Sequence, residues 1–320
     1  MLAPQAKYRT RLPQRSGQMF LTDGGMETTL IYHDGIDLPC FAAFTLLRTP
    51  DGVAHTRAYY ARYAAMAKRA GLGFVLETPT WRANADWGAK LGYSRSELAQ
   101  ANRQAVDLMA ELRAEFETPR SPMVISGAIG PRGDGYDPGR MMSADEAQAY
   151  HAEQIAAFRD SQADMVTAFT LNYINEGIGV ARAAKAAGMP VVISFTVETD
   201  GKLPTGETLK EAITAVDAAT GAAPVYYMVN CAHPTHFREA LATGESWVKR
   251  IGGLRANASR RSHAELDQAT ELDAGDPVEF GHLHADLRRM LPHATVLGGC
   301  CGTDHRHVEQ ISFACEELAA

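Results

Sequence analysis

Short apolar runs of strand length alternate along the chain with longer stretches that have helical character. Most of these runs are rich in β-branched or aromatic residues and are apolar at successive positions, which is typical of strands buried on both faces of a parallel sheet. The run at 251–256 is weaker than the others. The predicted strands are 19–22, 74–78, 124–127, 165–169, 191–195, 225–230, 251–256 and 295–298.

Helix signals fill the segments between the runs. Ser143 with Glu146 and Thr208 with Glu211 have the spacing of capping boxes, in which a side chain at each end satisfies a backbone N–H. Apolar residues recur at helical spacing after residue 53, and the stretch 176–187 is rich in alanine. A last helical stripe is predicted from Val308, Ile311, Cys315 and Leu318.

About eight strand–helix units follow from this alternation, which predicts an α/β protein with a parallel sheet. Eight units favour a single-domain (β/α)8 TIM barrel over residues 19–320, preceded by an N-terminal extension over residues 1–18. An open doubly wound sheet is the alternative, although no G-x-G-x-x-G motif follows the first strand. The Gly- and Pro-rich segment 130–142 predicts a long loop at the barrel mouth, either a lid or a plain surface loop.

Composition narrows the class of protein. The chain has 320 residues, 46% of them hydrophobic, and a formal net charge of −7 from 31 Lys and Arg against 38 Asp and Glu. This balance argues against nucleic acid as a partner, because binding to phosphates needs a basic face. No apolar run approaches the ~20 residues of a membrane span, so we expect a cytoplasmic protein without a membrane partner.

The chain has five cysteines, an odd number that makes a poor disulfide framework, and the strongest local signal is the motif at 297–303, which contains two of them. Cys300 and Cys301 follow the last predicted strand between glycines that let both thiols turn to one point. Cys231 follows the sixth strand, whose inward side chains share layers with those of the eighth. Three thiolates suit Zn²⁺ and leave a fourth, open position, as in catalytic sites; buried structural cysteines are the alternative. Cys40 and Cys315 are both predicted to be buried.

These motifs resemble those of the homocysteine S-methyltransferase family over residues 19–315. The resemblance rests on Asp23-Gly-Gly-Met after the first strand, Asn230-Cys231 after the sixth and Gly298-Gly-Cys-Cys-Gly-Thr303 after the eighth, supported by 129–131, 194–195 and 257–258. It implies a (β/α)8 barrel that binds zinc through Cys231, Cys300 and Cys301. It also implies transfer of a methyl group from a sulfonium or quaternary ammonium donor to a thiol, with homocysteine giving methionine.

The resemblance assigns substrate-binding roles to residues at the strand ends. Asp23 would bind the ammonium of the acceptor, with Gly24 and Gly25 allowing close approach of the backbone, although Asp23 could instead cap a helix. Glu176 could bind the same ammonium or only favour the start of its helix. Hydroxyl and amide groups that could bind the substrate or the backbone are Thr78, Ser194, Asn230 and Asn257.

Three positions depart from the family pattern. Phe169 stands where relatives carry a glutamate, Pro79 interrupts a Thr-Asn-Thr motif, and Arg255-Ala256 replaces Tyr-Pro before Asn257. The acceptor could therefore be another small thiol or a selenol, or the barrel could bind zinc and thiols without catalysis.

Groups near the predicted mouth add two further hypotheses. Trp81 and Tyr173 could bind a methylated cation through their aromatic faces or simply pack under a loop. His233, His305 and His307 lie near the cysteines in sequence, where surface or supporting roles are commoner than metal ligation. A homo-oligomer is left open.

Overall fold

The computed structural model describes residues 5–316 as a closed barrel of eight parallel strands, with β8 paired to β1. This confirms the predicted TIM barrel and excludes the open sheet. The predicted fifth and seventh strands have the observed bounds, and the others differ by a few residues. The strands are β1 Phe20–Leu21, β2 Gly73–Glu77, β3 Met123–Ile129, β4 Met165–Leu171, β5 Val191–Phe195, β6 Tyr226–Asn230, β7 Ile251–Ala256 and β8 Val296–Gly299.

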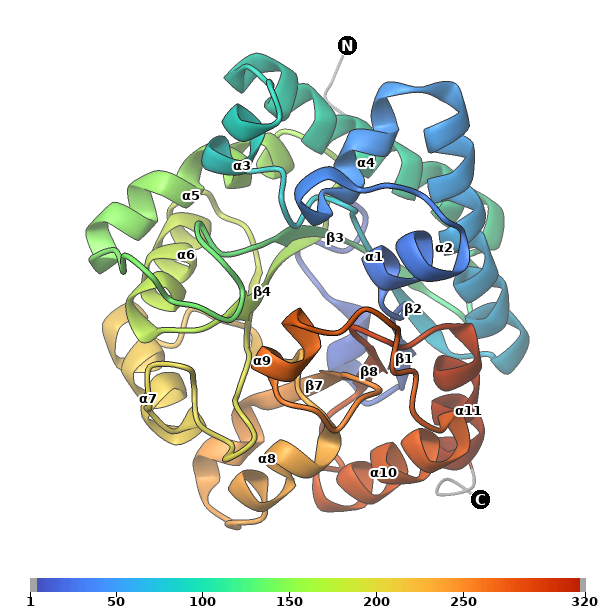
Figure 1. The fold of residues 1–320 in the computed structure, drawn as a ribbon, viewed down its shortest axis with the longest axis vertical. Coiled ribbons are helices and arrows are strands. Elements are labelled where there is room, and N and C mark those ends of the chain that lie inside the picture. Colours follow the sequence, from blue (N-terminus) through green and yellow to red (C-terminus); the bar gives the residue numbers. More distant parts are fainter. Residues whose placement is uncertain (1–4, 317–320) are drawn as a thin grey trace.

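Helices surround the barrel in an outer ring (Figure 1). Both predicted capping boxes are present, and Ser94 and Ser262 form two more. None of the helices within residues 5–316 is long and apolar enough to cross a bilayer. The helices are α1 Met26–Thr28, α2 Pro50–Ala70, α3 Ala85–Lys90, α4 Arg95–Phe116, α5 Ala144–Arg159, α6 Ile174–Ala186, α7 Leu209–Thr220, α8 Pro234–Leu241, α9 His263–Asp267, α10 Pro277–Met290 and α11 His305–Glu316.

The N-terminal segment before β1 packs against the barrel. Gln14 is buried, and the Thr295 hydroxyl donates a hydrogen bond to its carbonyl oxygen at 2.7 Å. Leu12 joins the apolar cluster formed by inward residues of the strands, such as Phe20 and Val124. The backbone N–H of Tyr8 donates to the Asp164 carboxylate at 2.6 Å. The segment thus covers the end of the barrel at which the strands begin.

Two cysteines outside the predicted metal site have different surroundings. Cys315 is buried on α11, as predicted, whereas Leu318 of the same predicted stripe lies outside the described residues. The prediction that Cys40 is buried is wrong, because this cysteine is exposed. Cys40 lies in a short 3-10 turn, Pro39–Phe41, at the edge of the cavity described below, where no core surrounds it.

Candidate metal centre and substrate cavity

Three cysteine thiols converge where β6 and β8 end. The Cys231 Sγ lies 2.8 Å from the Cys300 Sγ and 3.6 Å from the Cys301 Sγ. All three sulfurs lie within 4.8 Å of one another. Tetrahedral zinc with ~2.3 Å bonds would hold its sulfurs roughly 3.8 Å apart, so this cluster has the composition and size of a three-thiolate site after a small separation of Cys231 and Cys300.

Backbone hydrogen bonds between neighbouring loops hold the three cysteines in place. Cys231 has a left-handed φ of 56°, and its N–H donates to the Arg255 carbonyl at 3.1 Å. The N–H of Cys300 donates to the Ala256 carbonyl at 2.7 Å. Gly302 has a φ of 78°, which favours glycine, and its N–H donates to the Thr28 hydroxyl at 3.1 Å. Gly302 therefore allows the turn after the vicinal pair, as the sequence predicted.

The electrostatic surroundings favour an anionic sulfur in this cluster. Hydrogen bonds from the Cys231 and Cys301 thiols lower the pKa of Cys300 well below its usual range, and the charge of Arg255 acts in the same direction, whereas hydrogen bonding within the cluster raises the pKa values of Cys231 and Cys301. A thiolate is the form that binds metals. The donor set therefore fits a soft divalent ion such as zinc.

The Gly- and Pro-rich segment 130–142 forms a loop between β3 and α5, and its Tyr136 reaches the cysteines. The Tyr136 hydroxyl lies 3.4 Å from the Cys231 Sγ and 3.8 Å from the Cys301 Sγ. Its ring stacks on His263 at a centroid distance of 3.9 Å, and the His263 Nε2 lies 2.7 Å from the Cys231 carbonyl oxygen. The loop thus supplies a polar contact to the thiols that sequence patterns did not predict.

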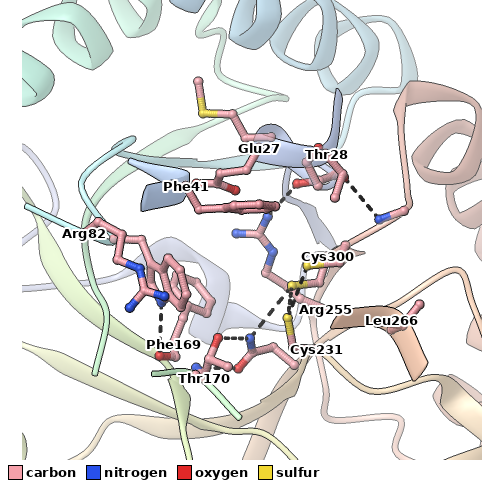
Figure 2. A pocket seen from close by; sticks show the side chains of 18 of the residues that line it. Glu27, Thr28, Phe41, Arg82, Phe169, Thr170, Cys231, Arg255, Leu266 and Cys300 are labelled. Atoms are coloured by element: carbon pink, nitrogen blue, oxygen red, sulfur yellow. Dashed lines mark hydrogen bonds between the residues drawn. The ribbon is translucent and has the colours of Figure 1, made fainter. Parts of the chain in front are cut away.

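A cavity of about 390 Å³ opens above the thiols (Figure 2). Its carboxylic residues outnumber its basic residues, Arg82 and Arg255, by seven to two. This excess of acidic groups suits a cationic ligand. The acidic lining residues are Asp23, Glu27, Glu77, Asp134, Asp267, Glu271 and Asp273.

Asp23 and Arg255 form a buried ion pair beside the cysteines. The Arg255 Nη2 donates to the Asp23 Oδ1 at 2.7 Å, and the Tyr59 hydroxyl donates to the Asp23 Oδ2 at 3.1 Å. Burial raises the pKa of Asp23, while the charge of Arg255 and the Tyr59 hydrogen bond lower it. Arg255, noted in the sequence only as a departure, is therefore the charge partner of the predicted substrate ligand.

Two further carboxyl groups of the cavity, the half-buried Glu27 and the buried Glu77, form no ion pair with a basic residue among the described residues. Burial raises the pKa of Glu27 to about 7 and that of Glu77 to about 8. The Glu77 Oε1 lies 3.5 Å from the Thr167 hydroxyl, but its Oε2 has no hydrogen-bond partner among the described residues. Both groups therefore carry a proton for much of the time near neutral pH.

The predicted substrate residues fall into two groups. Asp23, Gly24, Gly25, Thr78 and Asn230 line the cavity. The Thr78 hydroxyl contacts the Thr80 hydroxyl at 2.6 Å and accepts from the Ala128 N–H at 2.9 Å, so it also holds a loop. Its hydrogen bonds are made within the chain.

Ser194 and Glu176 are not among the residues that line the cavity. The Ser194 hydroxyl donates to the Asn230 side-chain oxygen at 2.6 Å, so it reaches the site only through Asn230. Glu176, near the start of α6, accepts from the Arg132 N–H at 2.8 Å and lies 2.9 Å from the His151 Nε2. Asn257 is buried, and its backbone N–H donates to the carbonyl of Ala232, the residue after Cys231, at 3.0 Å.

Aromatic groups at the mouth contact residues of the chain itself. Trp81 lines the cavity, but the Arg82 guanidinium lies 4.1 Å from its ring centroid and 3.8 Å from that of Trp87. Phe169 also lines the cavity, with Arg255 at 5.1 Å from its ring. Tyr173 is buried and accepts from the Met142 N–H at 3.2 Å, which is the packing role under a loop.

The three histidines near the cysteines in sequence have supporting contacts. The His233 side chain accepts from the Thr235 N–H at the start of α8. His305 lies 3.3 Å from an Arg62 nitrogen, and the His307 Nε2 lies 2.7 Å from the Ala274 carbonyl oxygen. His263, remote in sequence, is instead the histidine that contacts the backbone of a candidate ligand.

Gly25 allows the first and last loops of the barrel to approach each other. A Cβ at this position would lie 2.5 Å from the Cys300 carbonyl oxygen. We therefore expect Gly25→Ala to lower the free energy of unfolding by about 1–3 kcal/mol and to weaken zinc binding, because the Cys300 backbone must move. Urea denaturation and zinc titration measure both effects. Gly133→Ala is the control, since nothing lies within 4 Å of its Cβ; equal behaviour of the two variants would contradict the prediction.

Comparison with known proteins gives one matching family and similar solved structures. The family model described as homocysteine S-methyltransferase matches residues 20–315. The metallated form of the homocysteine methyltransferase MmuM from Escherichia coli superposes with a TM-score of 0.73 at 20% identity, covering 96% of this chain and 99% of that one. Its oxidized form gives 0.71 at 20% identity, over 98% and 100% of the two chains.

Proposed function

Because the chain belongs to the homocysteine S-methyltransferase family, we propose that it moves a methyl group from a sulfonium or quaternary ammonium donor to a thiol acceptor. Homocysteine is the proposed acceptor and methionine the product, which places the reaction in methionine biosynthesis. The observation that carries this proposal is the group of three cysteines beside the large cavity. We also propose a cytoplasmic location, where reducing conditions keep the thiols free.

Cys231, Cys300 and Cys301 are the residues that would hold Zn²⁺. Zinc held there would bind an acceptor thiol and would favour loss of its proton at neutral pH. The chain's own contribution is to fix the thiolates. The loop hydrogen bonds of Cys231 and Cys300 do so, and His263 adds a contact to the Cys231 carbonyl oxygen.

The transfer itself needs alignment more than acid or base groups of the protein. The acceptor sulfur forms a bond to the methyl carbon while the donor's bond to that carbon breaks. The bonding electron pair leaves with the donor, which becomes neutral, and the acceptor proton goes to solvent. Opposite charges disappear in this step, so a cavity that excludes water favours it. The acidic residues of the lining would attract the cationic donor.

For the acceptor, we propose contacts with the lining residues Asp23, Gly24, Gly25, Thr78 and Asn230. Ser194 acts by orienting Asn230, to which it is hydrogen-bonded. Glu176 takes the structural role of its two hydrogen bonds near the start of α6.

Methyl transfer by the zinc-loaded protein tests the proposal. The protein is incubated with homocysteine and, in turn, S-methylmethionine, S-adenosylmethionine and betaine, and methionine is measured by mass spectrometry alongside zinc content. Methionine from at least one donor is the expected result. If no thiol is methylated at full zinc occupancy, with homocysteine or with other small thiols and selenols, the proposal fails and a zinc- and thiol-binding barrel is favoured.

A further inference from the structure

The guanidinium of Arg255 extends from β7 into the cavity, beside the cysteines (Figure 2). Its Nε donates to the Gly299 carbonyl at 2.9 Å, and its Nη2 donates to Asp23 and to the Gly24 carbonyl at 3.1 Å. One side chain thus connects β7, β8 and the loop after β1. Only 8% of the residue is exposed, so this charge is fixed in place.

One nitrogen of this group is left for a ligand. The hydrogen bonds that Arg255 makes with the described residues use Nε and Nη2. Nη1 has no hydrogen-bond partner among the described residues, and it is not a fully buried atom. Because Arg255 lines the cavity, we infer that the exposed surface of Nη1 faces the cavity. A guanidinium N–H directed into a cavity is a strong site for a carboxylate.

Asp23, in contrast, is already engaged. Its Oδ1 accepts from Arg255 at 2.7 Å and its Oδ2 accepts from Tyr59 at 3.1 Å. Its charge is therefore balanced within the chain before any acceptor arrives. An acceptor ammonium at this carboxylate would lie next to the Arg255 cation and be repelled by it.

Glu27 and Glu77 are weakened as ammonium sites by their raised pKa values. Glu27 and Glu77 both line the cavity, Glu27 half-buried and Glu77 buried, and loss of solvent raises their pKa values to about 7 and about 8. A protonated carboxyl group is a weak partner for an ammonium. Within the Asp23–Arg255 pair, both carboxylate oxygens of Asp23 are used, whereas Arg255 keeps one nitrogen without a partner among the described residues, which leaves the pair open to an anion.

We infer that Arg255 selects the acceptor by its carboxylate and that the acceptor needs no ammonium group, so that mercaptocarboxylates are substrates. This inference rests on the proposed methyl transfer and narrows its acceptor class. The carboxylate binds the Arg255 guanidinium while the sulfur lies at the three cysteines. The sulfur gains the methyl group as described above, and the carboxylate is unchanged.

Binding and turnover of matched thiols test the inference. Homocysteine, 4-mercaptobutanoate, which lacks only the ammonium, and 1-butanethiol, which lacks any ionic group, are titrated into the zinc-loaded protein by calorimetry. We expect 4-mercaptobutanoate to bind within about threefold of homocysteine and 1-butanethiol to bind about tenfold or more weakly. A loss of about tenfold or more for 4-mercaptobutanoate would show that the ammonium is recognised and would overturn the inference.

Variants test whether Arg255 itself binds the carboxylate, as opposed to any loss of positive charge weakening the binding. Arg255→Gln should weaken 4-mercaptobutanoate about tenfold or more while leaving 1-butanethiol within about twofold. Arg250→Gln is the matched control, because Arg250 pairs with Asp217 outside the cavity. Arg255→Gln alone leaves Asp23 as an unpaired buried charge and could unfold the protein. In that case the double variant Asp23→Asn/Arg255→Gln, which removes this charge, is used in its place. Equal weakening of both thiols would overturn the inference.

The two hypotheses fail separately. Calorimetry requires no methyl donor, so carboxylate-selective binding without turnover contradicts the proposed methyl transfer and supports the role of Arg255. Turnover that requires the ammonium of homocysteine supports the transfer and contradicts the role of Arg255.

Discussion

Cys231→Ala should lose tight zinc binding and all measurable methyl transfer. The Cys231 Sγ lies within 3.6 Å of both other thiols, so removing it leaves two ligands from one loop. We expect zinc affinity to fall by more than about a hundredfold, because even groups outside the ligand set contribute about 10–100-fold. Competition with a chromogenic chelator measures the affinity, and mass spectrometry measures the product.

Cys315→Ala is the matched control for this experiment. Cys315 is buried on α11, so its replacement should cost about 1 kcal/mol of stability and leave zinc content unchanged. Circular dichroism should show the same helix content for both variants, since the barrel core is intact. Full zinc occupancy in Cys231→Ala would contradict the proposed site.

Glu77→Gln should make the protein less sensitive to rising pH. Burial raises the pKa of Glu77 to about 8 from the 4.5 of an exposed glutamate. The stabilising effect of the folded-state proton is therefore fully present below pH 4.5 and is lost as the pH rises through about 8. Each pKa unit is worth about 1.4 kcal/mol, so the wild type should lose about 2–5 kcal/mol relative to the variant across this window.

Urea denaturation at pH 5, 6.5 and 8 with matched zinc content measures this difference. Glutamine cannot ionise, so the advantage of the variant should grow with each step in pH. Glu239→Gln is the control, because Glu239 is exposed on α8, and it should follow the wild type throughout. A difference between Glu77→Gln and wild type that stays constant with pH would refute the prediction.

The barrel and the cysteine cluster could be predicted because their signals are local. Strands buried on both faces are apolar at successive positions, and eight such runs alternating with capped helices leave few architectures. The glycines around Cys300 and Cys301 mark a turn in the sequence itself. Once the barrel is assumed, Cys231 after the sixth strand falls near that turn.

The contacts of the substrate cavity could not be predicted in the same way, because they depend on how distant segments meet. Arg255 reaches Asp23 across β8, over a separation of 232 residues that only barrel closure brings together. Tyr136 lies in a loop whose path no periodic pattern specifies. Glu77 did leave a signal, since a carboxylic residue at the end of an otherwise apolar strand is costly unless it has a role.

The prediction that Cys40 is buried was wrong for a different reason. A cysteine between Pro39 and an aromatic residue suggested a buried position, because free cysteines are usually buried. The short turn over Pro39–Phe41 instead lies at the edge of the cavity, with Cys40 at a left-handed φ of 56°. Residue type alone did not distinguish a turn at the mouth from a core position.

The segment that packs beneath the strands has a kinetic consequence. With Leu12 and Gln14 covering that end, both substrates must enter through the opposite opening. In the proposed transfer, a thiol bound at the cysteines would lie deeper in the cavity than a donor that enters after it. Steady-state kinetics should then be ordered, with the acceptor binding first and the methylated thiol leaving last.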